Sequence, residues 1–287
     1  MPITYNNLYM DIRQALKGGG VTAATMEARE LVCCASGKSR EELMRDGQLY
    51  APPEVEKKAR ELMERHLNGE PVAYLIGEWE FYGMPLDISE AVLIPRVDTE
   101  VLVDEVIRYL GDRECRVLDL CAGSGCIGLA VAANCRNARV LLGEISEPAI
   151  RICRQNIRRN QLTGRVTVMP MDAKAAPARA LGEFDCIVSN PPYIPTKDIE
   201  GLDISVKGFE PHLALCGGVD GYDFYCSIIG LWKEALKPGG RLYFEVGIGQ
   251  ADTVLRMMRG HGFGDVNIVE DTAGIPRVVY GTLITEI

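Results

Sequence analysis

The sequence Asn190-Pro191-Pro192-Tyr193, here called the NPPY loop, combines residue types that could grip and orient an amino group. Proline fixes φ and has no N–H, so the two prolines favour a rigid loop that offers two acceptors, the side-chain oxygen of Asn190 and the carbonyl oxygen of Pro191. Tyr193 adds a flat aromatic surface. The motif predicts a site for a planar NH2 group, whose weakly nucleophilic nitrogen is oriented toward an electrophile without a strong base.

A second candidate lies upstream, in the segment Cys121-Ala122-Gly123-Ser124-Gly125, here called the glycine loop. It follows the apolar run Val117–Leu120, and with Gly128 it has the G-x-G-x-x-G spacing of a dinucleotide-binding turn, which alone is weak evidence. Glycine allows the backbone to approach a ligand closely. Glu144 ends the next strand-like run, about 20 residues beyond the first glycine, where a carboxylate can accept ribose hydroxyl protons.

Asp172 ends the third strand-like run, in a position suited to an adenine amino group. By itself Asp172 fits a simple turn equally well, and Glu144 could cap a helix. The NPPY loop could likewise be a structural turn, because Asn-Pro is a common turn starter. Together, however, the features lie after successive strands in register with the glycine loop, which favours a nucleoside site beside an amino-group site.

The elements that would position these residues alternate between strand and helix. Such βαβ alternation predicts a mostly parallel, doubly wound sheet, in which ligands bind at the carboxyl ends of the strands. Lys237-Pro238-Gly239-Gly240 is expected to be a turn before a strand, and Asp98 or Thr99 is expected to cap a helix that begins near Glu100. The expected strands cover residues 117–120, 140–142, 166–169, 186–189, 242–246, 266–269 and 278–284.

Residues 1–75 have a different pattern, with short helices separated by glycine clusters. Ser39-Arg40-Glu41-Glu42 has the form of a capping box. Residues 76–98 contain alternating apolar residues on both sides of Gly83, which predicts a β-hairpin. The sequence thus predicts an α/β protein with a helical domain at 1–75, a hairpin linker at 76–98 and a larger domain at 99–287.

The composition of the chain argues against several classes of function. The chain has 287 residues with 31 basic and 40 acidic side chains, a net charge of -9, which is the wrong sign for a protein that binds nucleic acid mainly through phosphates. No apolar stretch is long enough to span a membrane, and the N-terminus lacks a signal-peptide pattern, so a cytoplasmic protein is expected. Scattered cysteines and three histidines without ligand spacing predict no metal site.

These motifs resemble the class I S-adenosylmethionine-dependent methyltransferases, whose N-P-P-Y motif serves amino-group methylation. More narrowly, the chain is similar from end to end to the PrmC/HemK family, which methylates the glutamine amide in the Gly-Gly-Gln motif of class 1 peptide chain release factors. The segments that match this family more specifically are 71–77 (PVAYLIG), 81–83 (FYG), 93–96 (LIPR), 98–100 (DTE), 209–211 (FEP), 214–215 (AL), 217–218 (GG) and 220–221 (DG).

The resemblance implies a small N-terminal helical bundle that helps to recognise the release factor, joined by a β-hairpin to a seven-stranded Rossmann-like methyltransferase domain. S-adenosylmethionine, released as S-adenosylhomocysteine, would be the cofactor, and a monomer acting on a protein rather than on nucleic acid is expected. Catalysis is assigned to Asn190, Pro191 and Tyr193, and these with Pro192 would bind the substrate. The residues assigned to the cofactor are Cys121, Ala122, Gly123, Ser124, Gly125, Glu144, Asp172, Ala173 and Asn190.

The sequence departs from the family pattern in two places. The glycine loop commonly reads Gly-Thr-Gly-Ser-Gly, whereas here Cys121-Ala122 occupy the first two positions, and Ala173 stands where the family often has a tryptophan against the adenine. Arg96 and Glu100 either line the site or form an ion pair at a helix start. Two rival functions remain, methylation of an exocyclic amine of a DNA or RNA base and a non-catalytic cofactor-binding adaptor.

Overall fold

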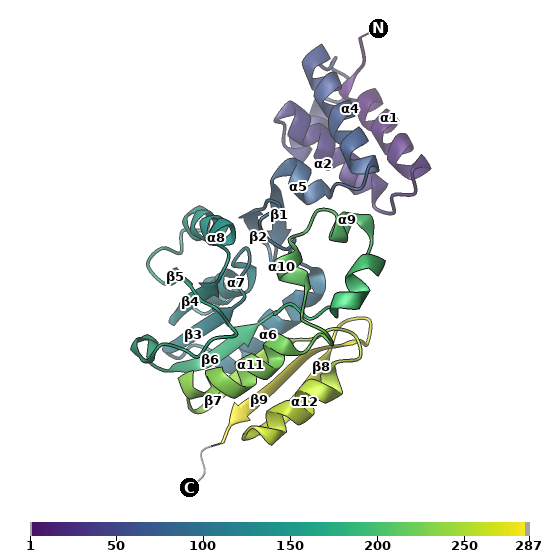
Figure 1. The fold of residues 1–287 in the computed structure, drawn as a ribbon. Coiled ribbons are helices and arrows are strands. Elements are labelled where there is room, and N and C mark those ends of the chain that lie inside the picture. The colour runs from purple at the N-terminus through teal and green to yellow at the C-terminus, as the bar shows by residue number, and fades with distance from the viewer. Residues whose placement is uncertain (1, 285–287) are drawn as a thin grey trace. The chain divides into compact units, whose positions relative to one another are not determined.

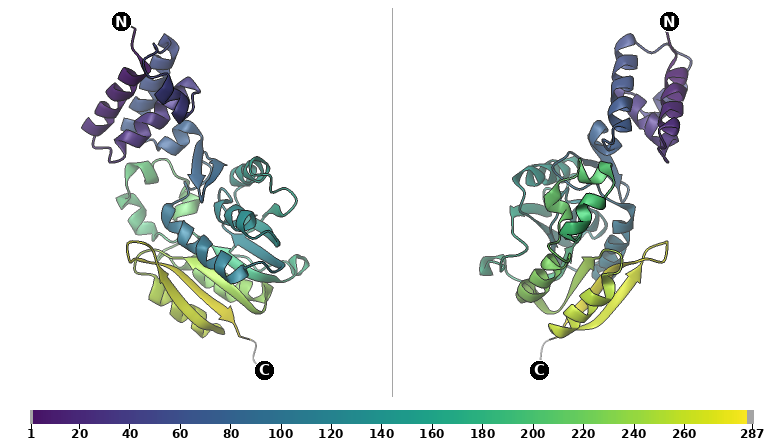
Figure 2. Two further views of the ribbon diagram at one scale, coloured as in Figure 1. Left: turned by 180° about the vertical axis from the view of Figure 1, so that it is seen from behind. Right: turned by 45° about the vertical axis from the view of Figure 1, so that its right-hand side comes forward.

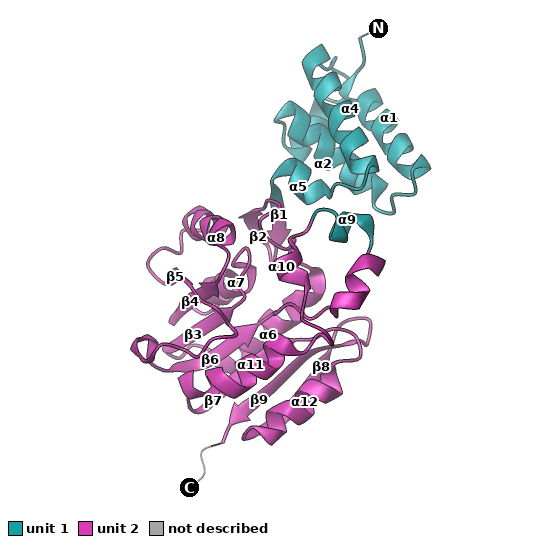
Figure 3. Cartoon of the chain, in the orientation of Figure 1, with its two compact units in different colours: residues 1–78, 203–209 teal, residues 79–202, 210–287 magenta. Residues whose placement is uncertain are grey.

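The structure is a computed structural model in which residues 2–284 are described. These residues form two compact units, coloured separately in Figure 3. Unit 1 contains residues up to 78 together with residues 203–209, and unit 2 contains residues 79–202 and the described residues from 210 onward. The chain therefore passes between the units three times, although the second visit to unit 1 is only seven residues long.

Unit 1 is a bundle of short helices, purple to blue in Figure 1. Leu8, Ile12 and Leu16 recur at helical spacing on α1 and are fully buried, which explains why this amphipathic segment packs against α2 and α4. On α2, Ala28, Leu31 and Val32 are buried, whereas Met26 is 44% exposed. The helices are α1 (Tyr5–Gly18), α2 (Ala24–Ser36), α3 (Arg40–Arg45), α4 (Pro53–Leu67) and α5 (Val72–Ile76).

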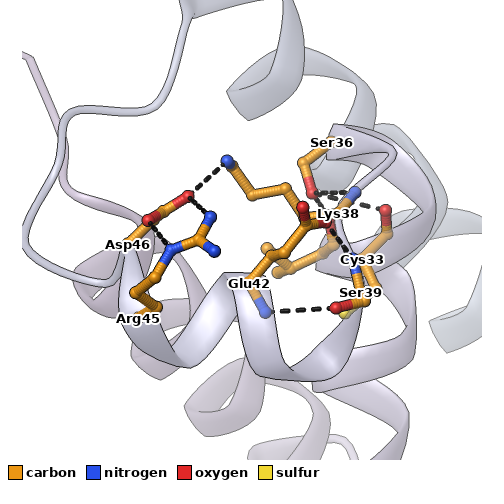
Figure 4. A network of polar contacts seen from close by, with 8 residues as sticks. Cys33, Ser36, Lys38, Ser39, Glu42, Arg45 and Asp46 are labelled. Atoms are coloured by element: carbon orange, nitrogen blue, oxygen red, sulfur yellow. Dashed lines mark hydrogen bonds and ion pairs between the residues drawn. The ribbon is translucent and has the colours of Figure 1, made fainter.

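The predicted capping box at the start of α3 is confirmed (Figure 4). The Ser39 hydroxyl accepts a hydrogen bond from the Glu42 N–H at 3.1 Å, and the Glu42 carboxylate accepts one from the Ser39 N–H at 2.9 Å. At the other end of α3, Asp46 forms ion pairs with Lys38 at 2.7 Å and Arg45 at 2.8 Å. The capping box thus satisfies two backbone N–H groups at the start of this six-residue helix.

Residues 203–209 return to unit 1 through α9 (Ile204–Lys207), which begins at an Asp203 cap. Gly69 has a φ of +97°, and a side-chain carbon built there would lie 2.8 Å from Ile204 Cγ2. The close approach of α9 to the end of α4 therefore requires a residue without a side chain.

The predicted hairpin is present as β1 (Glu78–Phe81) and β2 (Met84–Asp87), which form a two-stranded sheet. Tyr82 and Gly83 connect the strands with φ angles of +52° and +71°. Positive φ at both central residues is typical of the tight turn whose twist matches a β-hairpin.

The seven-stranded sheet in the described part of unit 2 confirms the predicted fold. Its strand order is β5-β4-β3-β6-β7-β9-β8; neighbours from β5 to β7 pair in parallel, and β9 pairs antiparallel with both β7 and β8. The strands are β3 (Cys115–Leu120), β4 (Ala138–Glu144), β5 (Val166–Pro170), β6 (Phe184–Ser189), β7 (Leu236–Glu245), β8 (Phe263–Glu270) and β9 (Pro276–Leu283).

Helices cover both faces of this sheet. Figure 1 shows α11 and α12 in front of it, and the view from behind in Figure 2 shows α6 in front of it, where α6 packs with α7. The core includes Trp232, Tyr225 and Phe244. The helices are α6 (Glu100–Leu110), α7 (Cys126–Asn134), α8 (Glu147–Arg159), α10 (His212–Leu215), α11 (Asp223–Leu231) and α12 (Ala251–Gly260), with short 3-10 turns η1 (Val97–Thr99), η2 (Arg179–Leu181), η3 (Thr196–Gly201) and η4 (Trp232–Ala235).

Two local predictions in unit 2 are wrong. Residues 237–240 do not precede β7 but lie within it, where the pairing register shifts between Phe184 and Cys186 on the neighbouring strand. Thr99 precedes α6, but its side chain makes no capping hydrogen bond, and neither does Asp98 cap that helix. No helix within residues 2–284 has the length and apolar character needed to cross a lipid bilayer.

Candidate active site

A cavity of 380 Å³ lies in unit 2, at the carboxyl ends of β3, β4 and β6. Its volume falls in the usual range for small-molecule sites, about 300–1,000 Å³. Of the residues predicted for the site, Gly125, Pro191 and Tyr193 do not line the cavity. The predicted residues that line it are Cys121, Ala122, Gly123, Ser124, Glu144, Asp172, Ala173, Asn190 and Pro192.

The glycine loop bends sharply between β3 and α7. Cys121, Gly123 and Gly125 have φ angles of +61°, +57° and +82°, and Gly125 is the residue that precedes α7. Glycine adopts this left-handed backbone without strain, whereas a cysteine does so at a cost of about 1–2 kcal/mol. The departure from the family pattern at Cys121 therefore keeps the backbone shape that a glycine there would favour.

The surroundings of Cys121 do not activate its thiol as a nucleophile. Burial, and then the nearby Glu144 carboxylate, raise the pKa of its thiol well above the ordinary value. Because the thiolate is the reactive form, a thiol held protonated in this way is inert.

Asp119 ties the end of β3 to the first turn of α7. Its carboxylate is fully buried and accepts a hydrogen bond from the Gly128 N–H at 2.9 Å. A side-chain carbon at Gly128 would lie 2.3 Å from Leu142 Cδ2 and 3.0 Å from the Asp119 carboxylate, so the glycine allows α7 to pack directly on the sheet. Burial, opposed by the Gly128 N–H and reinforced by Glu144, raises the pKa of Asp119 to about 7.

Glu144 joins the glycine loop to the start of α8. One carboxylate oxygen accepts a hydrogen bond from the Gly123 N–H at 2.8 Å, and the other accepts from the N–H groups of Ile145 and Ser146, each at 2.8 Å. The side chain is 7% exposed and lines the cavity. Glu144 is thus fixed in position by backbone donors on both sides.

Asp172 and Ala173 follow β5 on the same side of the sheet. The Asp172 carboxylate accepts a hydrogen bond from the Lys174 N–H at 2.8 Å, which is the turn that the sequence allows as an alternative. It also lines the cavity, so the turn and a contact with a ligand are compatible. The Ala173 carbonyl accepts a hydrogen bond from the Trp232 indole at 2.9 Å, and Phe224 is an aromatic residue on the cavity wall.

The NPPY loop is held by close backbone packing. The Gly217 N–H donates to the Ile194 carbonyl at 2.9 Å. A side-chain carbon at Gly217 would lie 2.7 Å from Tyr193 Cα and 2.8 Å from the Pro192 carbonyl oxygen. The segment around Gly217 can therefore approach the loop only because it has no side chain there.

Gln250, the residue that precedes α12, supports the same loop, and the sequence pattern contained no signal for it. Its amide nitrogen donates to the Tyr193 carbonyl at 3.0 Å, and its amide oxygen accepts from the Gly247 N–H at 3.0 Å and the Tyr225 hydroxyl at 3.3 Å. With only 8% of its surface exposed, Gln250 acts as a buried connector.

Asn190 is in contact with two buried polar side chains. Its amide nitrogen lies 3.5 Å from the Thr99 hydroxyl, and the Thr99 hydroxyl donates to the Glu245 carboxylate at 2.5 Å. Thr99 and Glu245 are 2% and 3% exposed. Thr99 lines the cavity, whereas Glu245 does not.

Arg96 and Glu100 turn out to have different partners. Arg96 forms an ion pair with the buried Glu210, which also accepts a hydrogen bond from the Ile94 N–H at 3.3 Å. Arg96 also lines the cavity, as one of the two alternatives predicted. The other alternative, an ion pair of Arg96 with Glu100, is wrong, because Glu100 instead accepts from the Tyr82 N–H at 2.8 Å. No group of three or more His, Cys, Asp or Glu side chains suited to a metal ion lies in the described part of the chain.

Comparison of the sequence with known proteins identifies the family of this chain. A family model described as the PrmC N-terminal domain matches residues 7–77, and one described as the methyltransferase small domain matches residues 86–203. The curated release factor glutamine methyltransferase of Geobacter sulfurreducens is 41% identical over 266 residues, which are 92% of this chain and 91% of that protein. The chain belongs to the release factor glutamine methyltransferase family.

A second member of this family, from Clostridium botulinum, is 34% identical over 92% of this chain and 94% of its own length. Among solved structures, a methyltransferase from Pyrococcus furiosus superposes with a TM-score of 0.52 at 17% identity, over 77% of this chain and 98% of that one. At this identity the match concerns the fold alone. The relative from Clostridium botulinum agrees with the family, and the solved structure agrees with the methyltransferase fold.

Proposed function

We propose that this chain transfers a methyl group from S-adenosylmethionine to the side-chain amide nitrogen of the glutamine in the Gly-Gly-Gln motif of class 1 peptide chain release factors. The observation that carries the proposal is the position of Asn190, on the wall of a cavity that the glycine loop and Glu144 also line. The relatives that match nearly the whole chain are named release factor glutamine methyltransferases.

The residues present fit the cofactor. The cavity is of small-molecule size, Glu144 presents a fixed carboxylate at the end of β4, and the glycine loop brings backbone rather than bulky side chains to the wall. Glu144 would hold the ribose, and Asp172 and Ala173 would lie at the adenine. When bound, S-adenosylmethionine supplies the electrophilic methyl group.

The protein's own part in the reaction is to bind and orient the substrate amide. An amide nitrogen is a weak nucleophile because its lone pair is delocalised, so orientation and hydrogen bonds to its N–H groups are the available means of assistance. The side-chain oxygen of Asn190 and the carbonyl oxygen of Pro191 are the proposed acceptors. Tyr193 supports the loop as part of its backbone framework, through the Gln250 hydrogen bond.

The helical residues 1–75 are proposed to help recognise the release factor, with the hairpin of residues 76–98 as linker and residues 99–287 as the methyltransferase domain. The enzyme is proposed to act as a monomer in the cytoplasm, on protein rather than on nucleic acid. The net charge of -9 supports a protein substrate over a polyanion.

The test is transfer of radiolabelled methyl from S-adenosylmethionine to a purified class 1 release factor. Its Gly-Gly-Ala variant is the matched control, and duplex DNA and RNA are offered separately. We expect label on the unmodified release factor alone. Label on nucleic acid only would contradict the proposed acceptor, and binding of the cofactor without any transfer would favour an adaptor.

The same assay with a short peptide that contains Gly-Gly-Gln tests the role proposed for the helical residues. If these residues contact the rest of the release factor, the peptide should be methylated with a much lower kcat/KM than the whole factor. Equal kcat/KM for the two substrates would contradict recognition outside the motif.

A further inference from the structure

Thr99 and Glu245 form a buried polar pair behind Asn190 that no capping or ion-pair role explains. Thr99 stands at the position where threonine normally caps a helix, yet its hydroxyl makes no hydrogen bond to the α6 backbone. It donates instead to Glu245, which ends the distant strand β7. Two buried side chains far apart in sequence are thus joined at the residue on which the proposed chemistry depends.

The distances determine which group donates and which accepts in the hydrogen bonds that link Glu245, Thr99 and Asn190. Thr99 has one hydroxyl proton, and at 2.5 Å from a carboxylate that proton is directed to Glu245. The hydroxyl oxygen can then only accept a hydrogen bond from its other neighbour. The contact at 3.5 Å with Asn190 therefore requires the NH2 end of the Asn190 amide to face Thr99.

The Asn190 amide is also among the groups that act to lower the pKa of Glu245. The contact with Thr99 occupies the amide nitrogen of Asn190 and leaves its oxygen for the substrate. An Asn190 amide turned the other way would present N–H groups to the N–H groups of a glutamine amide, and two donors do not bind each other.

We propose that Glu245, acting through Thr99, is a positioning residue that fixes the orientation of the Asn190 amide, so that its oxygen rather than its nitrogen meets the substrate amide. Glu245 does not line the cavity and does not touch the reacting atoms. The inference deepens the proposed function and rests on it for its readout.

The protonation state of Glu245 offers a specific signature. Burial raises the pKa of Glu245 to about 7, although the Thr99 hydroxyl and the Arg277 guanidinium act to lower it. Protonation would allow the Thr99 hydroxyl to turn toward Asn190, so the ordered state requires the carboxylate. The groups that face Glu245 from neighbouring elements are Arg277 on β9, Asp98 on η1, Tyr193 in the NPPY loop, Tyr225 on α11 and Cys126 on α7.

The test compares Glu245→Gln, Thr99→Val and Thr99→Ser in the full chain, with a class 1 release factor as substrate. We expect Glu245→Gln and Thr99→Val each to lower kcat about 10- to 100-fold, the range for loss of a hydrogen bond to a charged group. The double variant should be no slower than Thr99→Val to within about threefold, because both changes break one path. Thr99→Ser keeps the hydroxyl and should restore kcat to within about threefold of the wild type.

The pH profile separates positioning from a general loss of structure. In the wild type, kcat should fall as the pH drops through about 7, and this decline should be absent in Glu245→Gln. Wild-type methylation with an unchanged kcat in Glu245→Gln would overturn the positioning role alone, and additive losses in the double variant would do the same. If Glu245→Gln does not fold, the comparison of kcat in Thr99→Val and Thr99→Ser still tests the positioning role. Equal kcat in these two variants would overturn it. Failure of the wild type to methylate the release factor would instead contradict the proposed function.

Discussion

Asn190 and Glu144 reach the same cavity from two different strands, but they are held in different ways. Asn190 lies against side chains, whereas Glu144 is bound by three backbone N–H groups, including that of Gly123 in the glycine loop. Removing Asn190 therefore leaves the glycine loop intact. Removing the Glu144 carboxylate frees that loop and its backbone donors.

We expect Asn190→Ala to lower turnover about 100-fold or more with little change in the dissociation constant of S-adenosylmethionine, because it removes one preorganised acceptor. Glu144→Ala should raise that dissociation constant at least about tenfold, since a charge-assisted contact is lost. Calorimetric titration together with the methyl-transfer assay distinguishes the two. Near-normal turnover in Asn190→Ala would rule out the amide-gripping mechanism.

At the scale of elements, residues 215–218 make a close backbone contact with the NPPY loop. Gly217→Ala would place a carbon 2.7 Å from Tyr193 Cα, and neither backbone can move without displacing the loop. We expect this variant to lose most of its turnover and to melt at a lower temperature. Thermal melting and the methyl-transfer assay measure the two effects.

Gly230→Ala is the matched control, because a side-chain carbon at Gly230 in α11 would meet nothing within 4 Å. Alanine is more favourable than glycine within a helix by up to about 1 kcal/mol, so this control should be as stable as the wild type or more so. If Gly217→Ala matched Gly230→Ala in both measurements, the packing argument would be wrong.

The elements also show what sequence patterns could and could not reveal. Every expected strand is present, because short apolar runs between turn residues are typical of strands buried within a sheet. The cap predicted at Thr99 was wrong because a partner 146 residues away took its hydroxyl. Gln250 was missed for the same reason, since its role depends on four partners that only the folded chain brings together.

For the molecule as a whole, buried carboxyl groups link stability to pH. Burial raises the pKa of Asp119 to about 7, so the folded state holds a proton that the unfolded state has already lost above about pH 4. Stability from this group is therefore complete at low pH and is lost as the pH rises through about 7. Asp119→Asn keeps an acceptor for the Gly128 N–H but has no proton to lose.

We expect the melting temperature of Asp119→Asn to fall less than that of the wild type between about pH 5 and about pH 7.5. Asp185 provides a control of opposite sign: burial acts to raise its pKa, but the hydrogen bonds from Lys237 and the Arg116 N–H, together with nearby positive charges, outweigh burial and lower it. Asp185→Asn should thus lose most stability at neutral pH. Equal pH dependence in Asp119→Asn and the wild type would contradict the assignment.

The three passages of the chain between the units have a consequence for how the protein can be taken apart. A protease that cuts between residues 78 and 79 severs only one of them. The fragment 1–78 would still pack around residues 203–209, which belong to its unit but remain covalently part of the other piece. The nicked protein would stay together as a fragment complex, and separately expressed halves could reassemble, as they could not if a single linker joined two self-contained domains.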